Sequence, residues 1–391
     1  MQKPILLILC IVLFFVPAIF SMGVSLVAIE LIIIFLSLCF LLGRPIHTNR
    51  VVALMMVLVC IDKFNDLSSE FSISNIGPII YTLAITHVFV NLGKHKEELI
   101  TFMRRIAFLA VVINIFVCYM AGTPIRLLDR DVSVLLMFYF ILSYYYGNKK
   151  TIWLLLLGVL FIEIFILEAR TMILSFAGFL VLNWLMSRIR AKGFYKFVYF
   201  SSIVFTFGVI FYAIWYEFVG GSWQTTSELF TGRGYIWGNA LQEIYLKGST
   251  QTMLFGLPTT PAFLTKLFAG TFSGWLQETT EEILMAGHFH STVVYYIFNT
   301  GTVGTLLFFY ICYYALRKMK FSRENFCLFI AVYITSILNG RSLTGYYIMS
   351  TIFMLTLLVQ LPPSPNFYNK KIKKKRLYGT SKNAIGAKSS L

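Results

Sequence analysis

The sequence predicts an all-α polytopic membrane protein with about 12 transmembrane helices. Hydrophobic residues make up 58% of the 391 residues and charged residues only 13%, so the composition cannot supply a water-exposed surface of ordinary polarity. A transmembrane helix needs roughly 20 apolar residues to cross about 30 Å of hydrocarbon. Twelve apolar stretches are candidates, and the third and eleventh are the shortest. They are residues 4–21, 23–43, 51–64, 75–92, 105–122, 132–147, 151–168, 171–187, 197–217, 291–316, 326–338 and 344–361.

The first stretch could also be a signal peptide, because Lys3 precedes it. However, no small-x-small cleavage site follows, and the second stretch begins almost at once. We therefore expect the first stretch to remain as a transmembrane helix.

The distribution of positive charge predicts the orientation. With both termini in the cytoplasm, 25 of the 33 lysine and arginine residues lie on the cytoplasmic side and eight on the opposite side. This is the positive-inside pattern, with an even number of spans. The basic tail, residues 362–391, is interpreted as a solvated topology determinant close to anionic membrane lipids rather than as a nucleic-acid-binding segment. We expect no nucleic-acid partner.

The cysteines predict neither a disulfide framework nor a metal site. All six fall inside predicted spans, and no two have the spacing of metal ligands. They are Cys10, Cys39, Cys60, Cys118, Cys312 and Cys327.

One long segment of ordinary polarity, residues 218–290, separates the ninth span from the tenth on the outer side. Loops of this length are usually functional or disordered, and its aromatic and aliphatic residues argue against disorder. The predicted organisation is nine spans in 1–217, a large outer loop with short amphipathic helices in 218–290, three spans in 291–361, and a basic cytoplasmic tail in 362–391.

Within this loop, "TGRGYIWGNALQEIYLKG" predicts a short amphipathic helix with Thr231 as N-cap and Gly248 at its end. Arg233 falls in the first turn, where the helix dipole favours an anion rather than a cation. It could therefore bind phosphate or pyrophosphate, since guanidinium binds such oxygens in bidentate fashion; a solvated loop arginine is the alternative. The apolar stripe, which we expect to face the membrane or the bundle, comprises Ile236, Trp237, Ala240, Leu241, Ile244 and Tyr245.

Four other arginines lie at the outer ends of predicted spans, where they could bind an anion or act as interfacial anchors. They are Arg126, Arg130, Arg170 and Arg341. Because positive-inside sorting disfavours arginine on this side, each is a candidate. Arg170 is the strongest, and Glu163 on the preceding span could be its partner. A charged group within a span costs about 2.5–3.5 kcal/mol at the bilayer centre, so Glu30 and Glu163 should have a structural or functional role.

Two histidines, His288 and His290, lie where the outer loop enters the tenth span. The positive potential of a helix N-terminus favours a neutral imidazole, which suits a general base that takes a proton from a sugar hydroxyl. They could instead simply mark the helix start. A metal site is less favoured because no third ligand stands at a recognisable spacing, so we expect neither a metal nor a cofactor.

Three motifs in order resemble those of the bacterial O-antigen ligase and polymerase family. "HSTVVYYIFNTGTVGTLLFF" resembles a segment in which a histidine opens a helix and two glycines follow, here His290, Gly301 and Gly304. "GRGYIW", followed by "LFG" at 254–256, resembles the family's Arg-and-Trp signature, and "ARTMILSFAGFL" resembles its Arg-led span. The resemblance covers residues from Arg170 to roughly 310.

The resemblance implies a membrane glycosyltransferase of the bacterial inner membrane with a periplasmic active site. Its donor would be an undecaprenyl-pyrophosphate-linked oligosaccharide, and its partners could include a flippase and a chain-length regulator. By resemblance, His290 would position or deprotonate the acceptor, and Arg233 and Arg170 would hold the pyrophosphate. Arg341 is a further candidate for the pyrophosphate. His288 and Trp237 are candidates for binding the acceptor.

Two departures from the family pattern bear on the choice of activity. Ser291 stands where asparagine is common after the histidine, and the outer loop has no arginine besides Arg233, although Lys247 and Lys266 could serve. The second departure favours an O-antigen polymerase over a ligase that transfers the finished polymer to lipid A-core. A transporter or flippase for lipid-linked sugars is the third alternative. The absence of an internal repeat and of paired broken spans disfavours it.

Overall fold

The computed structural model describes residues 2–42, 49–70, 73–122, 125–147, 151–166, 170–189, 191–218, 233–268, 289, 291–339 and 348–363. For some residues at helix ends, including Arg126, Arg130 and Arg170, only the backbone is described. All regular structure in these ranges is helical. This confirms the predicted all-α class.

Each of the twelve apolar stretches coincides with helix. The first forms two helices, α1 (Gln2–Phe14) and α2 (Val16–Ser21), which meet at Phe15 just before Pro17. The others are α3 (Leu26–Leu41), α4 (Arg50–Ser69), α5 (Ile73–Val90), α6 (Lys96–Met120), α7 (Ile125–Tyr146), α8 (Ile152–Phe165), α9 (Arg170–Arg188), α10 (Lys192–Phe218), α16 (Thr292–Lys318), α17 (Arg323–Asn339) and α18 (Ile348–Leu358).

Within the described ranges, three helices are long and apolar enough to cross a membrane by length and composition: α6, α10 and α16. Six more are apolar but shorter, namely α1, α3, α5, α7, α8 and α9. The structure thus supports a helical membrane protein, and the full number of 12 spans stays a prediction.

The helix α4 continues to Ser69, beyond residue 64, where its apolar stretch ends. Its last turns carry Asp62, Lys63 and Asp66, all of which are buried. Asp62 and Lys63 lie inside the predicted stretch and Asp66 just beyond it, and the helix continues past all three.

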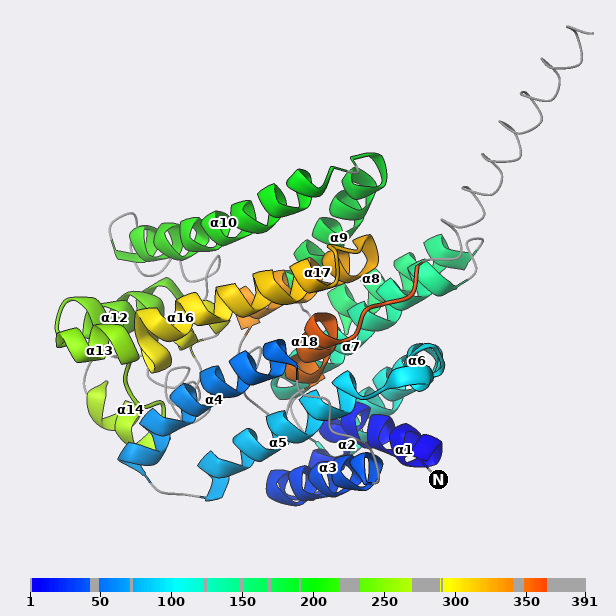
Figure 1. The fold of residues 1–391 in the computed structure, drawn as a ribbon, viewed down its shortest axis with the longest axis horizontal. Coiled ribbons are helices and arrows are strands. Elements are labelled where there is room, and N and C mark those ends of the chain that lie inside the picture. Colours follow the sequence, from blue (N-terminus) through cyan, green and yellow to red (C-terminus); the bar gives the residue numbers. More distant parts are fainter. Residues whose placement is uncertain are drawn as a thin grey trace, which may run out of the picture.

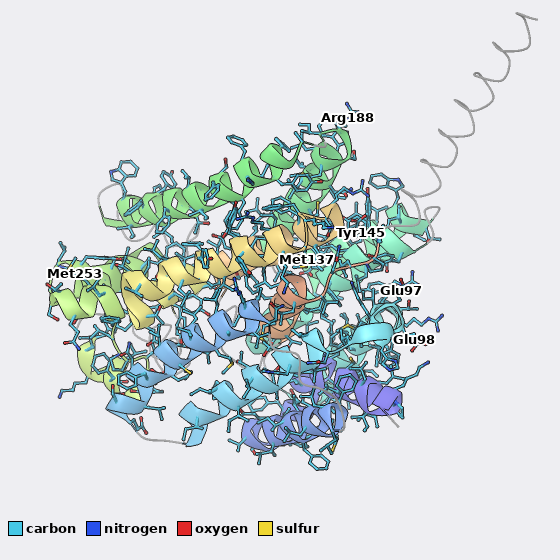
Figure 2. The ribbon with its side chains drawn as sticks, viewed as in Figure 1. Glu97, Glu98, Met137, Tyr145, Arg188 and Met253 are labelled. Carbon is cyan, nitrogen blue, oxygen red and sulfur yellow. The ribbon has the colours of Figure 1, made fainter. Side chains whose placement is uncertain are left out.

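Three short helices, α12 (Arg233–Tyr245), α13 (Thr250–Phe255) and α14 (Pro261–Leu267), form the described part of the predicted outer loop. They gather at one end of the molecule, where α4 and α10 end and α16 begins (Figure 1). Met253 marks this end in Figure 2, and Glu97, Glu98 and Arg188 lie at or toward the opposite end. The loop helices therefore cap one end of the bundle.

Large apolar side chains cover much of the outer surface of the bundle. Such a surface requires an apolar surrounding, because a soluble monomer rarely exposes large contiguous apolar patches. On α8 and α10 the exposed residues include Trp153, Leu154, Leu157, Phe161, Phe165, Phe197, Val204, Phe205 and Phe211. Membrane lipid is the surrounding that fits.

The two carboxylates that the sequence placed within spans are both buried in the bundle. Glu163 of α8 is fully buried and accepts a hydrogen bond of 2.8 Å from Ser133 Oγ of α7. Glu30 of α3 lies against Gly77 of α5, where an added Cβ would stand 2.4 Å from Glu30 Oε1. Both link neighbouring helices, whereas the contact between Glu163 and Arg170 stays a prediction because the Arg170 side chain lies outside the described residues.

Candidate functional site

The helix α12 packs against the bundle, in contact with α10 and α16. The apolar stripe predicted from the sequence supplies this face, with Ile236, Trp237, Ala240 and Ile244 buried. Tyr245 lies at the edge of the stripe and is 39% exposed. The apolar stripe of α12 therefore faces the bundle, which is one of its two predicted locations, rather than the membrane surface.

A hydrogen bond joins α12 to the chain just before α16. The buried indole of Trp237 donates from Nε1 to the backbone oxygen of Phe289 at 2.7 Å. Phe289 is itself buried against Phe298, with ring centroids 4.7 Å apart. The next residue in the sequence is His290, and Arg233 begins α12 one turn before Trp237, about 6 Å along the helix axis.

Of the predicted site residues, the structure describes Trp237 and Arg233, which is half-buried. Arg170 is the first residue of α9, and its side chain lies outside the described part. The other three, His288, His290 and Arg341, also lie outside it. Because the N–H of Trp237 is engaged by Phe289, the structure gives this residue a positioning contact, and its contact with an acceptor stays a prediction.

The helix α16 begins at Thr292, two residues after the predicted catalytic histidine, close to the start of the predicted span. Ser291 is its N-cap, with Oγ accepting from the backbone N–H of Val294 at 3.4 Å. Serine is a preferred residue at this position because its hydroxyl satisfies a free backbone donor. The departure from asparagine at position 291 thus retains a helix-starting residue.

Two glycines allow the end of α13 to pack backbone against backbone on α16. Gly256 and Gly301 both have positive φ, at 83° and 63°, with ψ near −160°. This region is essentially restricted to glycine. A Cβ at Gly256 would stand 2.4 Å from the backbone of Asn299, and one at Gly301 would stand 2.4 Å from the backbone of Leu254. Gly256 of "LFG" therefore lies against the backbone of α16, and Gly301 of "NTG" lies against the backbone of α13.

Hydrogen bonds surround this glycine contact. Leu257 N–H donates to the Phe298 backbone oxygen at 2.7 Å, and Thr302 Oγ1 donates to the Met253 backbone oxygen at 3.0 Å. From α4, Asn65 Nδ2 donates to the backbone oxygen of Phe255 at 2.7 Å and also to that of Asn299. Beside the kink at Gly301, these bonds engage the backbone oxygens of Phe298 and Asn299.

A buried set of polar side chains lies beside the kink, which we name the α4–α16 polar cluster. Asp62 accepts from Tyr295 Oη at 2.5 Å and from Asn299 Nδ2. Lys63 and Asp66 form an ion pair of 2.7 Å in which both side chains are 3% exposed. Asp66 Oδ1 also accepts from the backbone N–H and the hydroxyl of Thr259, at 2.7 and 3.0 Å. The cluster comprises Asp62, Lys63, Asp66, Thr259, Tyr295 and Asn299.

This cluster fixes the segment between α13 and α14 to α4 and to the first turns of α16. The sequence did not predict this cluster, because Thr259, Tyr295 and Asn299 lie far from α4 in the chain. A signal was present: Asp62 and Asp66 are four residues apart, hence on one helix face, and they directly follow an apolar run.

An apolar groove of about 620 Å³ runs between α10 and α12. It begins close to Trp237, one turn beyond Arg233, and continues to the end of α12. Phe207, Ile210, Phe211, Ile214, Gly238, Leu241, Gln242, Tyr245, Leu246 and Ile297 line it. This groove can hold a long apolar chain, and Arg233 lies at the start of the same helix.

Asp66→Ala should destabilise the protein strongly. The change removes the carboxylate that faces Lys63 in the interior, and removing one partner of a buried ion pair typically costs about 3–5 kcal/mol. The thermal unfolding midpoint of the purified protein, followed by tryptophan fluorescence, measures this. The matched control is Glu243→Ala, which breaks the pair of Glu243 with the exposed Lys247 and should cost about 1 kcal/mol or less. Equal shifts for the two variants would contradict a structural role for the cluster.

Among the described residues, no group of three or more histidine, cysteine, aspartate or glutamate side chains could hold a metal ion. Comparison with protein-family models, with curated proteins and with solved structures found no match to this chain. The likeness to the O-antigen ligase and polymerase family therefore depends on the motif residues themselves.

Proposed function

We propose that this chain is a polymerase for O-antigen or a related surface polysaccharide. It joins undecaprenyl-pyrophosphate-linked oligosaccharide repeat units at the periplasmic face of the bacterial inner membrane. The observation that carries the proposal is the hydrogen bond from Trp237 to Phe289, because it links the helix that Arg233 begins to the residue preceding His290. In the proposed topology, 12 spans place both termini in the cytoplasm and α12, α13 and α14 in the periplasm.

The proposed reaction is a glycosyl transfer that inverts C1 and needs no metal. The oxygen of an acceptor hydroxyl attacks C1 of the donor's first sugar, and its proton passes to His290. The bond from C1 to the pyrophosphate oxygen breaks, and its electron pair leaves with the polyprenyl pyrophosphate. Arg233 stabilises the charge that develops there, with Arg170 and Arg341 as further pyrophosphate contacts and His288 on the acceptor side.

The groove between α10 and α12 supports this donor class. A polyprenyl pyrophosphate combines a strongly anionic head with a long apolar chain. Arg233 and the apolar groove occur on the same helix in the matching order, with the cation at its first residue and the groove beginning about one turn later. A water-soluble nucleotide sugar would have no use for the apolar part.

Deletion of the gene tests the proposal against its two alternatives. In a strain that expresses the protein, we expect lipopolysaccharide on a gel to show core bearing a single repeat unit, because chain extension is lost. Reintroducing the gene should restore the ladder of long chains. Bare core with accumulated lipid-linked polymer would instead indicate a ligase. Normal banding would remove both enzyme functions.

A further inference from the structure

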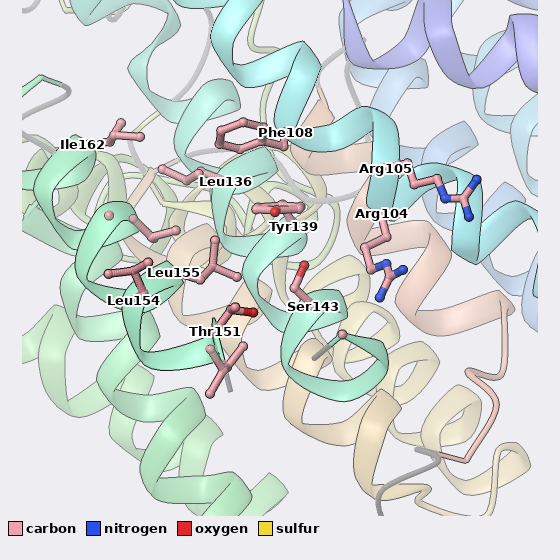
Figure 3. A pocket seen from close by; sticks show the side chains of 14 residues that line it. Arg104, Arg105, Phe108, Leu136, Tyr139, Ser143, Thr151, Leu154, Leu155 and Ile162 are labelled. Atoms are coloured by element: carbon pink, nitrogen blue, oxygen red, sulfur yellow. The ribbon is translucent and has the colours of Figure 1, made fainter. Parts of the chain in front are cut away.

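A cavity of about 680 Å³ lies between α6, α7 and α8 (Figure 3). None of its lining residues belongs to the α4–α16 polar cluster or to the groove beside α12. It is lined by Arg104, Arg105, Phe108, Leu136, Tyr139, Ser143, Gly147, Thr151, Ile152, Leu154, Leu155, Gly158, Val159 and Ile162. The proposed reaction does not use it.

The polar residues of this cavity gather at one end. Arg104 and Arg105 lie in the third turn of α6, and Ser143 and Thr151 lie near the end of α7 and the start of α8. Arg104 is half-buried and donates from one nitrogen to the Tyr146 backbone oxygen at 2.5 Å, which uses one of the five donors of its guanidinium. Among the described residues that line the cavity, none is acidic. This end therefore suits an anion.

The remaining wall is apolar and has the depth of one leaflet. The cavity-lining residues at the start and along the length of α8 run from Thr151 to Ile162. These are eleven residues apart, which is about 16 Å along the helix axis at 1.5 Å per residue. Half of a hydrocarbon core of about 30 Å is about 15 Å. Leu154, Leu155 and Val159 follow this wall, with Phe108 opposite on α6. A cation at one end and a leaflet-deep apolar wall match the two parts of a phospholipid.

We propose that this cavity binds one anionic phospholipid, with its phosphate at Arg104 and Arg105 and one acyl chain along α8. On the proposed topology, the lipid belongs to the cytoplasmic leaflet, at the opposite end of the bundle from the glycosyl transfer site. The site itself does not depend on the polymerase activity. A zwitterionic lipid would fit the apolar wall equally well, so the two arginines determine the preference for an anionic headgroup.

The test uses full-length protein purified from vesicles of equal parts phosphatidylglycerol and phosphatidylcholine, with retained lipids counted by native mass spectrometry. Wild type should retain phosphatidylglycerol in preference to phosphatidylcholine. Arg105→Gln should lower that retention about fivefold, as expected for the loss of one cation near an anionic headgroup. Arg104→Lys, which keeps the charge, should retain most of it. Equal retention of the two lipids by wild type would overturn the proposal.

A second variant tests the apolar wall without touching the arginines. Gly158 of α8 lines the cavity, and a Cβ added there would meet no heavy atom within 4 Å, so we expect Gly158→Leu to place its side chain in the cavity. It should lower retention of phosphatidylglycerol severalfold. Gly208 of α10 is equally open but does not line the cavity, so Gly208→Leu should retain lipid as wild type does. Equal losses in both variants, or a loss in neither, would overturn the proposal.

Discussion

Replacing Gly301 by alanine is expected to prevent α13 from docking on α16 and to lower the stability of the protein by several kcal/mol. Two costs coincide at this residue. Its φ of 63° with ψ of −162° lies in a region that other residues adopt only at a cost of about 1–3 kcal/mol. An added Cβ would also meet the backbone of Leu254 at 2.4 Å, where no flexible side chain can move aside. Forced overpacking typically costs a further 1–3 kcal/mol.

Thermal unfolding and limited proteolysis of purified protein measure this effect. Gly301→Ala should lower the unfolding midpoint and make residues 250–268 more susceptible to protease. Gly256→Ala should behave in the same way, because its Cβ would meet Asn299 across the same contact. The control is Gly208→Ala, in a helix with no heavy atom within 4 Å of the added Cβ. If Gly301→Ala unfolds at the same temperature as this control, the glycine contact does not hold the site together.

The helices were predictable from the sequence because each apolar stretch is long and local. A run of apolar residues that must satisfy its backbone within a membrane can only be helical there. The same reasoning predicted the buried stripe of α12, since Ile236, Trp237, Ala240 and Ile244 recur at helical spacing. It also predicted the start of α16 to within one residue, since the predicted span begins at 291 and the helix at Thr292. These features depend on neighbours in the sequence.

The contacts that assemble the site were not predictable in this way, because they join residues far apart in the chain. Asp66 meets Thr259 across 193 positions, and Asn65 meets Asn299 across 234. The glycines of "LFG" and "NTG" suggested a motif, but no periodicity indicates that their backbones meet. The sequence also did not predict that α4 continues to Ser69; Lys63 and Asp66 form a buried ion pair, and the helix continues past both.

The second large effect is expected at the two residues to which we assign the chemistry. Arg233→Ala and His290→Ala should each abolish polysaccharide chain formation while membrane abundance stays at the wild-type level. Loss of a general base typically lowers the rate about 10²–10⁴-fold, and loss of a donor that stabilises developing charge about 10²–10³-fold. Each variant is expressed in the deletion strain. The ladder of lipopolysaccharide chains on a gel then measures chain formation, and immunoblots of membranes measure the abundance of the protein.

Substitutions that keep one property of each side chain separate chemistry from packing. Arg233→Lys keeps the charge but loses the planar pair of donors. If Arg233 binds the pyrophosphate in bidentate fashion, this variant should restore chain formation only in part. Arg188→Ala removes an arginine at the opposite end of the bundle, where it stacks on Trp184, and should leave the ladder intact. Because Trp237 joins α12 to Phe289 through its indole N–H, Trp237→Phe should weaken chain formation without abolishing it. A full ladder from Arg233→Ala or His290→Ala would reassign that residue to a structural role and remove the proposed mechanism.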